Sequence, residues 1–412
     1  MARKRRATIQ RLRVTVLIFG LCVAAQAAPE YKVLFNFNGA DGNAPWGGVS
    51  VGNDGAVYGA SGGGGTGPCT NGCGLLFKIS RKGTTWAEDI LYSFQGGADG
   101  LGPTGGVTVA SDGTLLGTTT WGGTEKNGTV WKLAPLRDGW SEKVLYSFPG
   151  DAQGCCPESG VVISNAGKLY GTAAATYELE PEPDGWKYSV LHEFLGQDGD
   201  GYDPFAGVIR DDRGNLYGTT EYGGNQCGSS SCGTVYELSP EPDGKWKEAI
   251  LHRFNDKASD GTMPGWGALY MDSAGSLYGT TAGGGCCGGV IFRLSPRNSG
   301  GWTYTILYDF KGGALGYEPN TGVVMGRDGS LYGTTDYGGG PNSCGVLYKL
   351  APTGNDKWQY SVLHVFGEGN DGCVPEGDLV IDQQGNLYGS LVLGGEYGYG
   401  AIFELSTVAS PQ

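Results

Sequence analysis

The chain has 412 residues, of which 79 are glycine, 39% are apolar and 17% are charged. This apolar share allows a sizeable core, and the glycines lack the three-residue period of collagen. The formal net charge of −14 becomes −20 without the six basic residues of the first 27 positions. We therefore expect no nucleic-acid partner, because an acidic domain repels phosphate backbones.

The first 27 residues have the pattern of an export signal. Basic residues occupy the stretch from Arg3 to Arg13, an apolar stretch runs from Val14 to Ala25, and the run Ala25-Gln26-Ala27 offers a cleavage site. The apolar stretch is too short to span a bilayer, which favours a cleaved signal peptide over an uncleaved anchor. We expect an exported protein, placed in the periplasm, on the cell surface or outside the cell, with no transmembrane segment after residue 27.

One unit recurs seven times in the rest of the chain. Its most regular part reads G-x-L-Y-G-T-T, and its two glycines lie four positions apart in every copy. The second glycine falls at Gly59, Gly117, Gly171, Gly218, Gly279, Gly333 and Gly389. The intervals of 47 to 61 residues are the length of a four-stranded propeller blade. The sequence therefore predicts an all-β fold, with residues 28–412 forming a single seven-bladed β-propeller.

Each unit predicts four strands, named a to d in chain order. Strand a follows a proline, as in Gly106–Ala110, and strand b is the LYGTT run, as in Leu216–Thr220. Strand c has a central aromatic residue, as in Gly233–Leu238, and strand d follows a tryptophan, as in Val144–Phe148. Val, Ile, Leu, Thr and Tyr dominate these runs, while Gly, Pro, Asn and Asp separate them.

The two ends of the repeat array complement each other. The last unit stops after strand c, near Ile402–Leu405, whereas the chain after the signal begins with a lone strand d, Val33–Phe37. We expect the N-terminal strand to complete the seventh blade. This pairing closes the ring and leaves no unpaired blade edge.

Several motifs carry a family resemblance. They are the approach from Asp99-Gly100 to Pro103, the core Gly214–Thr220, the pair Gly223-Gly224 and the GTVYEL strand that follows. Together they resemble the GloVer tandem repeat of secreted and surface bacterial proteins, and the strand order is more distantly similar to kelch propellers. The resemblance covers nearly the whole chain after the signal. It implies a β-propeller and no particular activity.

Three histidines, His192, His252 and His364, occupy one column of strand d where other copies have tyrosine. They belong to the outermost strands of three different blades, so we expect them to lie far apart. Metal ligands must converge within a few ångströms. We therefore interpret these histidines as structural and expect neither a metal site nor a cofactor.

Repeated carboxylates have a structural interpretation too. Asp41, Asp99, Asp260 and Asp371 share one column, and each precedes a glycine, a pair that favours a turn. The run Asp198–Asp203 comes closest to a calcium loop but lacks the full alternation of oxygen ligands.

Residues that break the repeat are the candidates for ligand binding. Arg210 lies on strand a where other copies are aliphatic, and either meets a ligand in the central channel or pairs with a nearby aspartate. The second set is aromatic and lies in the d–a and b–c loops, which open on the same face. It consists of Trp46, Trp121, Phe205, Tyr222, Trp266 and Tyr337. These side chains form either a platform for sugar rings or a partner protein, or covers over loop edges.

Three functions remain open at this point. The leading one is a non-enzymatic, monomeric binding module for a glycan or a surface protein, at the face of the d–a and b–c loops. The second is a propeller enzyme acting on polysaccharide through two carboxylates. The candidates for that pair are Glu158, Glu221, Asp336 and Glu376. The third is a structural envelope protein, and no catalytic residue is assigned.

Ten cysteines remain once Cys22 leaves with the signal, an even number that favours disulfides in an exported chain. All ten fall in b–c or d–a loops, so we expect them on one face. The expected bonds are Cys69–Cys73, Cys227–Cys232 and Cys344–Cys373, with the vicinal pairs Cys155–Cys156 and Cys286–Cys287. Zinc half-sites are the rival interpretation of the closely spaced pairs.

Overall fold

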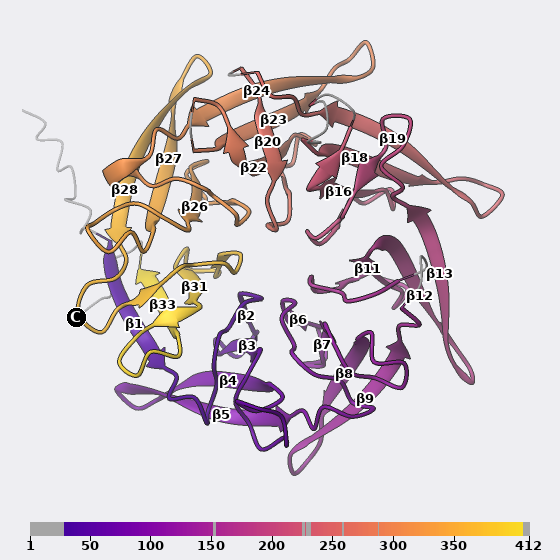
Figure 1. Cartoon of the computed structure of the whole chain (residues 1–412), viewed down its shortest axis with the longest axis vertical. Coiled ribbons are helices and arrows are strands. Elements are labelled where there is room, and N and C mark those ends of the chain that lie inside the picture. Colours follow the sequence, from indigo (N-terminus) through magenta and orange to yellow (C-terminus); the bar gives the residue numbers. More distant parts are fainter. Residues whose placement is uncertain are drawn as a thin grey trace, which may run out of the picture.

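The computed structural model describes residues 29–150, 154–224, 227, 232–257, 259–286 and 288–406, so the predicted signal peptide lies outside the described residues. Seven antiparallel sheets stand around a central axis as the blades of a propeller (Figure 1). Each blade has four strands, and a loop strand adds a fifth to one of the sheets. The fold class predicted from the repeat is confirmed. Within the described residues the only helical element is the 3-10 turn η1 (Gly313–Leu315), and none could span a bilayer.

The two inner strands of each blade are short. Strand a has two or three residues in each blade: β2 (Val49–Val51), β6 (Thr108–Val109), β10 (Val162–Ile163), β15 (Ile209–Arg210), β21 (Tyr270–Met271), β25 (Val324–Met325) and β30 (Val380–Ile381). Strand b is the LYGTT run: β3 (Val57–Ser61), β7 (Leu115–Thr119), β11 (Leu169–Ala173), β16 (Leu216–Thr220), β22 (Leu277–Gly284), β26 (Leu331–Thr335) and β31 (Leu387–Leu391). The repeated run within strand b is buried in all seven blades, because neighbouring blades cover both of its faces.

The outer strands are longer. Strand c is β4 (Leu75–Lys82), β8 (Thr129–Pro135), β12 (Ala175–Glu182), β18 (Thr234–Pro240), β23 (Val290–Pro296), β27 (Val346–Gly354) and β33 (Ala401–Ser406). Strand d is β5 (Thr85–Ser93), β9 (Trp140–Ser147), β13 (Gly185–Glu193), β19 (Trp246–Arg253), β24 (Trp302–Asp309) and β28 (Lys357–Val365). Strand d begins earlier than Val144 in blade 2, because Trp140 already pairs with Pro135 at the end of strand c.

The N-terminal strand completes the seventh blade. The strand β1 (Glu30–Asn36) pairs antiparallel with β33, from Glu30 opposite Ser406 to Asn36 opposite Ala401. Figure 1 shows the first and last strands, β1 and β33, side by side in this blade, with β1 on its outer side. The expected closure of the ring is confirmed, and β1 starts three residues before Val33.

Packing between the inner and outer strands explains two columns of the repeat. The second glycine of strand b lies directly opposite the central aromatic residue of strand c, as Gly117 lies opposite Trp131. A methyl group on Gly117 would come within 2.5 Å of the Trp131 ring, and all seven blades have the same close approach. The glycine therefore makes room for a large, fully buried ring, which fills the space between blades.

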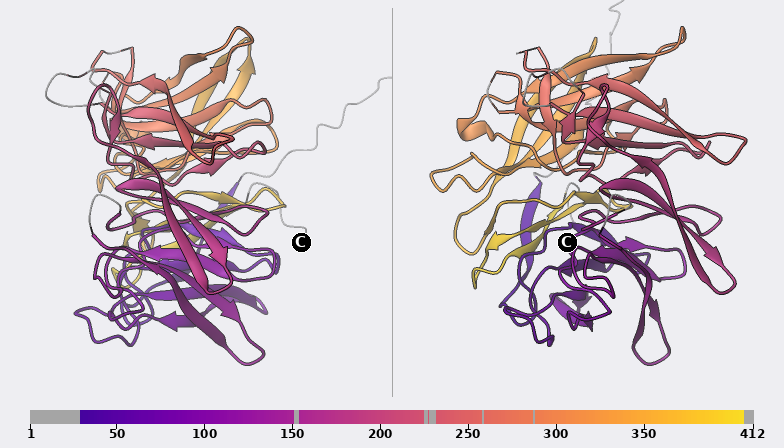
Figure 2. Two further views of the ribbon diagram at one scale, coloured as in Figure 1. Left: turned by 90° about the vertical axis from the view of Figure 1, so that its right-hand side faces the viewer. Right: turned by 45° about the vertical axis from the view of Figure 1, so that its right-hand side comes forward.

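The d–a and b–c loops meet on one face of the ring. In six blades a residue of the d–a loop pairs with a residue of the b–c loop, as Leu101 pairs with Trp121. In three blades these contacts form short pairs of strands. They are β14 (Gly201–Tyr202) with β17 (Tyr222–Gly223), β20 (Gly261–Pro264) with the end of β22, and β29 (Gly372–Cys373) with β32 (Leu393–Gly394). The side view and the oblique view of Figure 2 show hairpins extending from the ring.

Candidate binding face and the seams between blades

The d–a loop of every blade makes the same strained turn before its proline. The residue before that proline has a φ between 53° and 65° in all seven copies. These residues are Ala44, Gly102, Cys156, Asp203, Met263, Glu318 and Val374. A residue before proline ordinarily prefers extended backbone, so the conformation must be held by its surroundings.

The b–c loop of the preceding blade holds this turn. In six copies the N–H of the turn residue donates to a carbonyl of that loop, as Gly102 donates to Cys73 at 3.0 Å and Val374 to Cys344 at 3.2 Å. The exception is Asp203, because blade 3 joins β11 to β12 through the single residue Ala174. The rim of the channel therefore lacks one loop at blade 3.

The turn brings the residue after the proline to the mouth of the central channel. A cavity of about 520 Å³ opens there. Five of the seven copies line it with a residue close after this proline: Trp46, Thr104, Glu158 and Glu376 follow the proline directly, and Trp266 follows Pro264 by two positions. This column is among the most variable of the repeat, although it occupies equivalent places in the seven blades.

The aromatic candidates divide into two groups. Trp46, Trp121 and Trp266 line the cavity, and their exposed fractions are 36%, 51% and 47%. Phe205 lies next to them, with its ring centre 5.9 Å from that of Trp266. Tyr222 and Tyr337 lie on the same face but are not among the described residues that line the cavity.

Carboxylates gather at the same mouth. Burial raises the pKa of Glu376 to about 7. Burial also raises the pKa of Asp336 to about 8, against a hydrogen bond from Asn320, and the charges of Glu376 and Glu318 add to the rise. One oxygen of Glu376 and one of Asp336 are buried and accept no hydrogen bond within the described residues.

A second acidic group lies on blades 3 and 4. Burial raises the pKa of Glu158, and the charges of Glu221 and Asp203 raise it further. The four carboxylates singled out from the sequence therefore form two groups, Glu158 with Glu221 and Asp336 with Glu376. Glu158 and Glu376 line the cavity.

Asp378 also lines the cavity and was missed by the sequence analysis. Its carboxylate accepts hydrogen bonds from the backbone N–H groups of Ala268 at 3.0 Å and Gly322 at 2.7 Å, which belong to blades 5 and 6. The sequence did contain a sign of its special role, because five of the other copies have glycine at this position and one has alanine.

Arg210 lies at the end of its strand that is away from the cavity. It is the last residue of β15, where the chain enters the a–b hairpin, and its guanidinium approaches Gly214 in that hairpin. Its Nε is buried and donates no hydrogen bond within the described residues. Arg210 is therefore not among the residues that the structure places around the cavity.

The three histidines lie on three different outer strands, β13, β19 and β28. Each pairs with the aspartate that lies four residues before the proline of the following d–a loop: His192 with Asp200 at 3.3 Å, His252 with Asp260 at 3.1 Å and His364 with Asp371 at 2.7 Å. The aspartate column therefore does more than form a turn. It also holds the ring on strand d.

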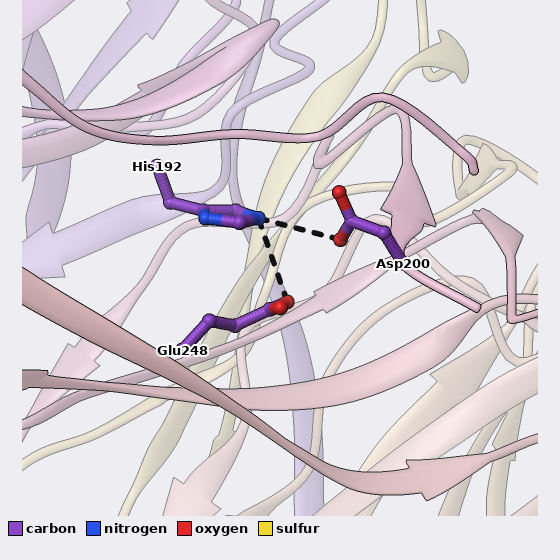
Figure 3. A group of neighbouring side chains, drawn as sticks. All are labelled: His192, Asp200 and Glu248. Atoms are coloured by element: carbon purple, nitrogen blue, oxygen red, sulfur yellow. Dashed lines mark hydrogen bonds and ion pairs between the residues drawn. The ribbon is translucent and has the colours of Figure 1, made fainter. Parts of the chain in front are cut away.

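One histidine has a second acidic neighbour. His192 Nε2 lies 3.6 Å from Glu248 Oε1, and Glu248 comes from strand d of the next blade (Figure 3). Burial raises the pKa of Glu248 to about 7. Of the run Asp198–Asp203, only Asp200 joins this cluster, whereas Asp203 acts on Glu158 at the channel mouth. The repeat pattern alone gave no sign of this cluster, because His192, Asp200 and Glu248 belong to three different columns.

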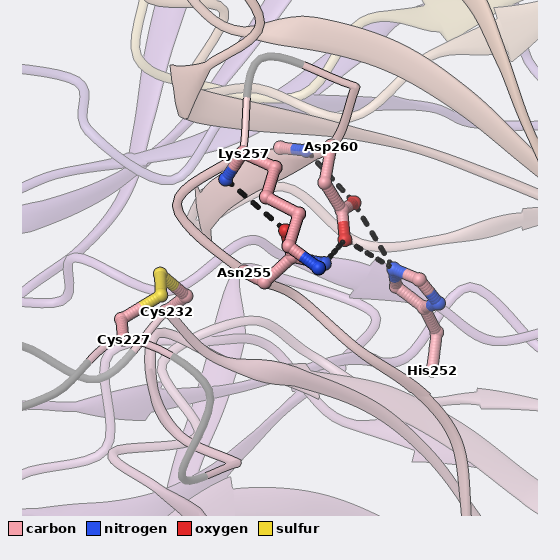
Figure 4. Close-up of a disulfide and its surroundings, with 7 residues drawn as sticks. Cys227, Cys232, His252, Asn255, Lys257 and Asp260 are labelled. Atoms are coloured by element: carbon pink, nitrogen blue, oxygen red, sulfur yellow. Dashed lines mark hydrogen bonds and ion pairs between the residues drawn. A yellow bond between two sulfur atoms is a disulfide. The ribbon is translucent and has the colours of Figure 1, made fainter.

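Four disulfides join described cysteines. Their Cα atoms are 5.0 Å apart in Cys69–Cys73, 5.8 Å in Cys227–Cys232 and 4.6 Å in Cys344–Cys373, and Cys155–Cys156 forms a vicinal bond. Figure 4 shows Cys227–Cys232 near the loop from which Asn255 and Asp260 extend. The remaining expected pair includes Cys287, which lies outside the described residues.

The architecture defines a seven-bladed propeller built from tandem repeats. The chain belongs to the Gloeobacter/Verrucomicrobia repeat family, whose model matches residues 17–178 and 173–403. No curated protein matches the chain.

Solved structures share the fold at low identity. An ancestral GH74 enzyme is 14% identical, with a TM-score of 0.53 and coverage of 90% of this chain and 49% of the enzyme. The extracellular domain of a hybrid two-component system from B. thetaiotaomicron is 13% identical, with a TM-score of 0.55 and coverage of 91% and 39%. The chain thus spans half or less of the length of these proteins, and the likeness concerns the fold alone.

Proposed function

We propose that this chain is an exported, non-enzymatic binding protein that takes a neutral glycan at the mouth of its central channel. The observation that carries the proposal is one cavity of about 520 Å³ lined by three exposed tryptophans together with Glu158, Glu376 and Asp378. Pockets for small ligands combine such apolar walls with a few polar groups that fix orientation.

The two kinds of side chain suit the two kinds of surface on a sugar. The ring faces of a sugar are apolar and stack on indole rings, which supply contact area at low entropic cost. Sugar hydroxyls are hydrogen-bond donors, and Glu376 offers a buried oxygen that accepts no hydrogen bond within the described residues. An unsatisfied buried acceptor costs free energy that a donating ligand recovers.

The charge of the mouth narrows the ligand class. Among the described residues that line the cavity there is no lysine or arginine, whereas three are carboxylates. Above the raised pKa of Glu376, about 7, an acidic polysaccharide would be repelled, because like charges in a partly buried site are weakly screened. A neutral hexose or pentose oligosaccharide meets no such repulsion.

Export is part of the proposal. The four disulfides fit an oxidising compartment, where such bonds persist. Expression of the full chain in a bacterial host should release a mature protein that begins at residue 28, as N-terminal sequencing would show. Recovery of the uncleaved chain in membranes would contradict a cleaved signal.

The experiment is a neutral-glycan array probed with the purified mature chain, followed by calorimetry on the hits. Trp121→Ala and Trp266→Ala should each weaken binding about tenfold or more, because each removes a stacking surface. Tyr397→Ala is the matched control, since Tyr397 is equally exposed, at 54%, but does not line the cavity. Equal losses in all three variants, or binding only to acidic glycans, would contradict the proposal.

A polysaccharide hydrolase is the second candidate, favoured by the raised pKa values of Asp336, about 8, and Glu376, about 7. A carboxyl group that stays protonated near neutral pH is what a general acid requires. Turnover of the array hits should then be lost in Glu376→Gln while binding persists. Absence of turnover in the native chain leaves binding as the function.

A further inference from the structure

Four of the seven seams between the outer strands of neighbouring blades share one pattern. The ring in the tyrosine/histidine column of one strand d packs on a tyrosine of the next strand d. The stacked pairs, with ring-centre distances, are Tyr146–Tyr188 at 4.3 Å, His252–Tyr304 at 4.1 Å, Tyr308–Tyr360 at 4.1 Å and His364–Tyr31 at 3.5 Å. At the other three seams a glutamate takes the place of the second ring: Glu88, Glu142 or Glu248. Of these three, Glu248 is the one that faces a histidine, at the seam between blades 3 and 4.

Three potential ligand atoms meet at this seam. His192 Nε2, an oxygen of Asp200 and an oxygen of Glu248 all lie within 4.8 Å of one another. The histidine nitrogen lies 3.3 Å from Asp200 Oδ1 and 3.6 Å from Glu248 Oε1. In a tetrahedral site with metal–ligand bonds of about 2.0–2.1 Å, neighbouring ligand atoms are about 3.3 Å apart. The three side chains in Figure 3 converge on one point from two blades.

The carboxylates at this seam have fewer side-chain hydrogen-bond donors than the carboxylate at the next seam. In the seam between blades 4 and 5, Asp260 receives hydrogen bonds from both His252 and Asn255. The residue equivalent to Asn255 near Asp200 is Leu195, which has no side-chain donor. Among the described residues, Asp200 therefore accepts hydrogen bonds, besides that of His192, only from the backbone N–H groups of Leu195 at 3.1 Å and Gly201 at 2.6 Å. Glu248 Oε1 is buried and accepts no hydrogen bond within the described residues.

We propose that His192, Asp200 and Glu248 bind one divalent transition-metal ion, with Zn²⁺ as the representative, and that this ion links blades 3 and 4. One imidazole nitrogen and two carboxylate oxygens suit zinc and neutralise its charge. The side chains are 24%, 17% and 18% exposed, so the ion can enter from solvent, and water completes its coordination. The site departs from the expectation of no metal, because its ligands are one histidine and two carboxylates from adjacent blades.

The test uses the mature chain, stripped of metal with a chelator and kept non-reducing so that its disulfides persist. We expect calorimetry with ZnCl₂ to give one tight ion per chain, and thermal unfolding to shift upward with zinc concentration, because the ion binds only the folded state. Mg²⁺ and Ca²⁺ should give no comparable shift, since both ions prefer six or more oxygen ligands.

Two variants remove a ligand while keeping the local shape. Glu248→Gln and His192→Tyr should each weaken zinc binding at least tenfold and abolish the thermal shift, and tyrosine is already present at the position of His192 in three other copies. Glu142→Gln is the matched control: Glu142 occupies the Glu248 column in blade 2 but faces Tyr92. Failure of the native chain to bind zinc, or binding that survives both ligand variants, would overturn the proposal.

Discussion

The two ends of the propeller ring differ, although both are built from the same seven copies. At the end that carries the a–b hairpins, every copy makes the same turn, in which a glycine N–H donates to the carbonyl three residues earlier, as Gly113 donates to Ala110 at 3.0 Å. On the opposite face, the d–a loops share one backbone turn before the proline. The residue after the proline differs between blades: it is Trp46 in blade 1, Glu158 in blade 3 and Asn320 in blade 6.

This difference teaches where to look for function in a repeat protein. Repeated positions are repeated because each blade must pack on its neighbours, so they report on the scaffold. A position that varies on a common backbone is free of that requirement. The channel mouth and the seam between blades 3 and 4 are both places where side chains depart from the repeat while the backbone keeps it.

The largest effect is expected from breaking the scaffold itself. Deletion of residues 28–36 removes β1 and exposes the edge of β33, which then lacks its ladder partner. We expect the melting temperature to fall by about 10 °C or more, or the protein to associate. Lys32→Ala, which removes only an exposed ion pair with Glu30, is the control. A monodisperse variant with native stability would show that the ring does not need this closure.

The disulfide between blades 6 and 7 should come next. Cys344–Cys373 closes a 29-residue loop, whereas Cys69–Cys73 closes a four-residue loop. In the chain-entropy model their removal costs about 3–4 and about 2 kcal/mol, respectively. Denaturant unfolding of the two double serine variants should rank them in this order. The reverse order would mean that local packing, rather than loop length, controls the stability of this face.

Two glycines allow the two faces of the propeller to be compared directly: Gly47 at the channel mouth and Gly55 in an a–b hairpin. At the channel mouth, a Cβ on Gly47 would lie 2.4 Å from the backbone of Gly105 in the next blade, whereas a Cβ on Gly55 in an a–b hairpin meets nothing within 4 Å but has a φ of +73°. We expect Gly47→Ala to cost about 2–3 kcal/mol through overpacking, and Gly55→Ala about 1 kcal/mol through backbone strain. Similar losses in chemical denaturation would contradict this division.

The smallest effect concerns pH at the seam between blades 7 and 1. Burial, with Asp41 and Asp89 nearby, raises the pKa of Glu88 to about 8. The folded state then holds a proton that the unfolded state loses near pH 4.5, so this group destabilises the fold increasingly as the pH rises from about 4.5 to about 8. Glu88→Gln should match the native chain at pH 5 and melt about 1–2 °C higher at pH 9. Glu182→Gln, at an exposed position of the c–d hairpin of blade 3, is the control, and a gain at pH 5 would refute the assignment.

Much of the fold could be predicted from the sequence, because the same pattern of strands and turns recurs seven times. Seven blades are predicted by the glycine of strand b, the aromatic residue of strand c (Gly117 and Trp131 in blade 2) and the a–b turns. The closure of the ring is predicted by the strand d that the last repeat lacks. The boundaries of strand d were less accurate, since hydrophobic alternation weakens towards the exposed c–d hairpin. The sequence also predicts that Trp46 and Trp266 lie in loops that open on one face, and both line the cavity there.

What remained was decided by contacts between blades. The sequence placed His192, Asp200 and Glu248 in three separate columns, and only the packing of β13 beside β19 brings them within 4.8 Å. Asp378 reaches Ala268 and Gly322 across two blades, at a separation of up to 110 residues. A repeat specifies the structure of one blade, but the partners of a side chain at a seam come from the next blade. Such sites therefore follow from the tertiary arrangement of the blades.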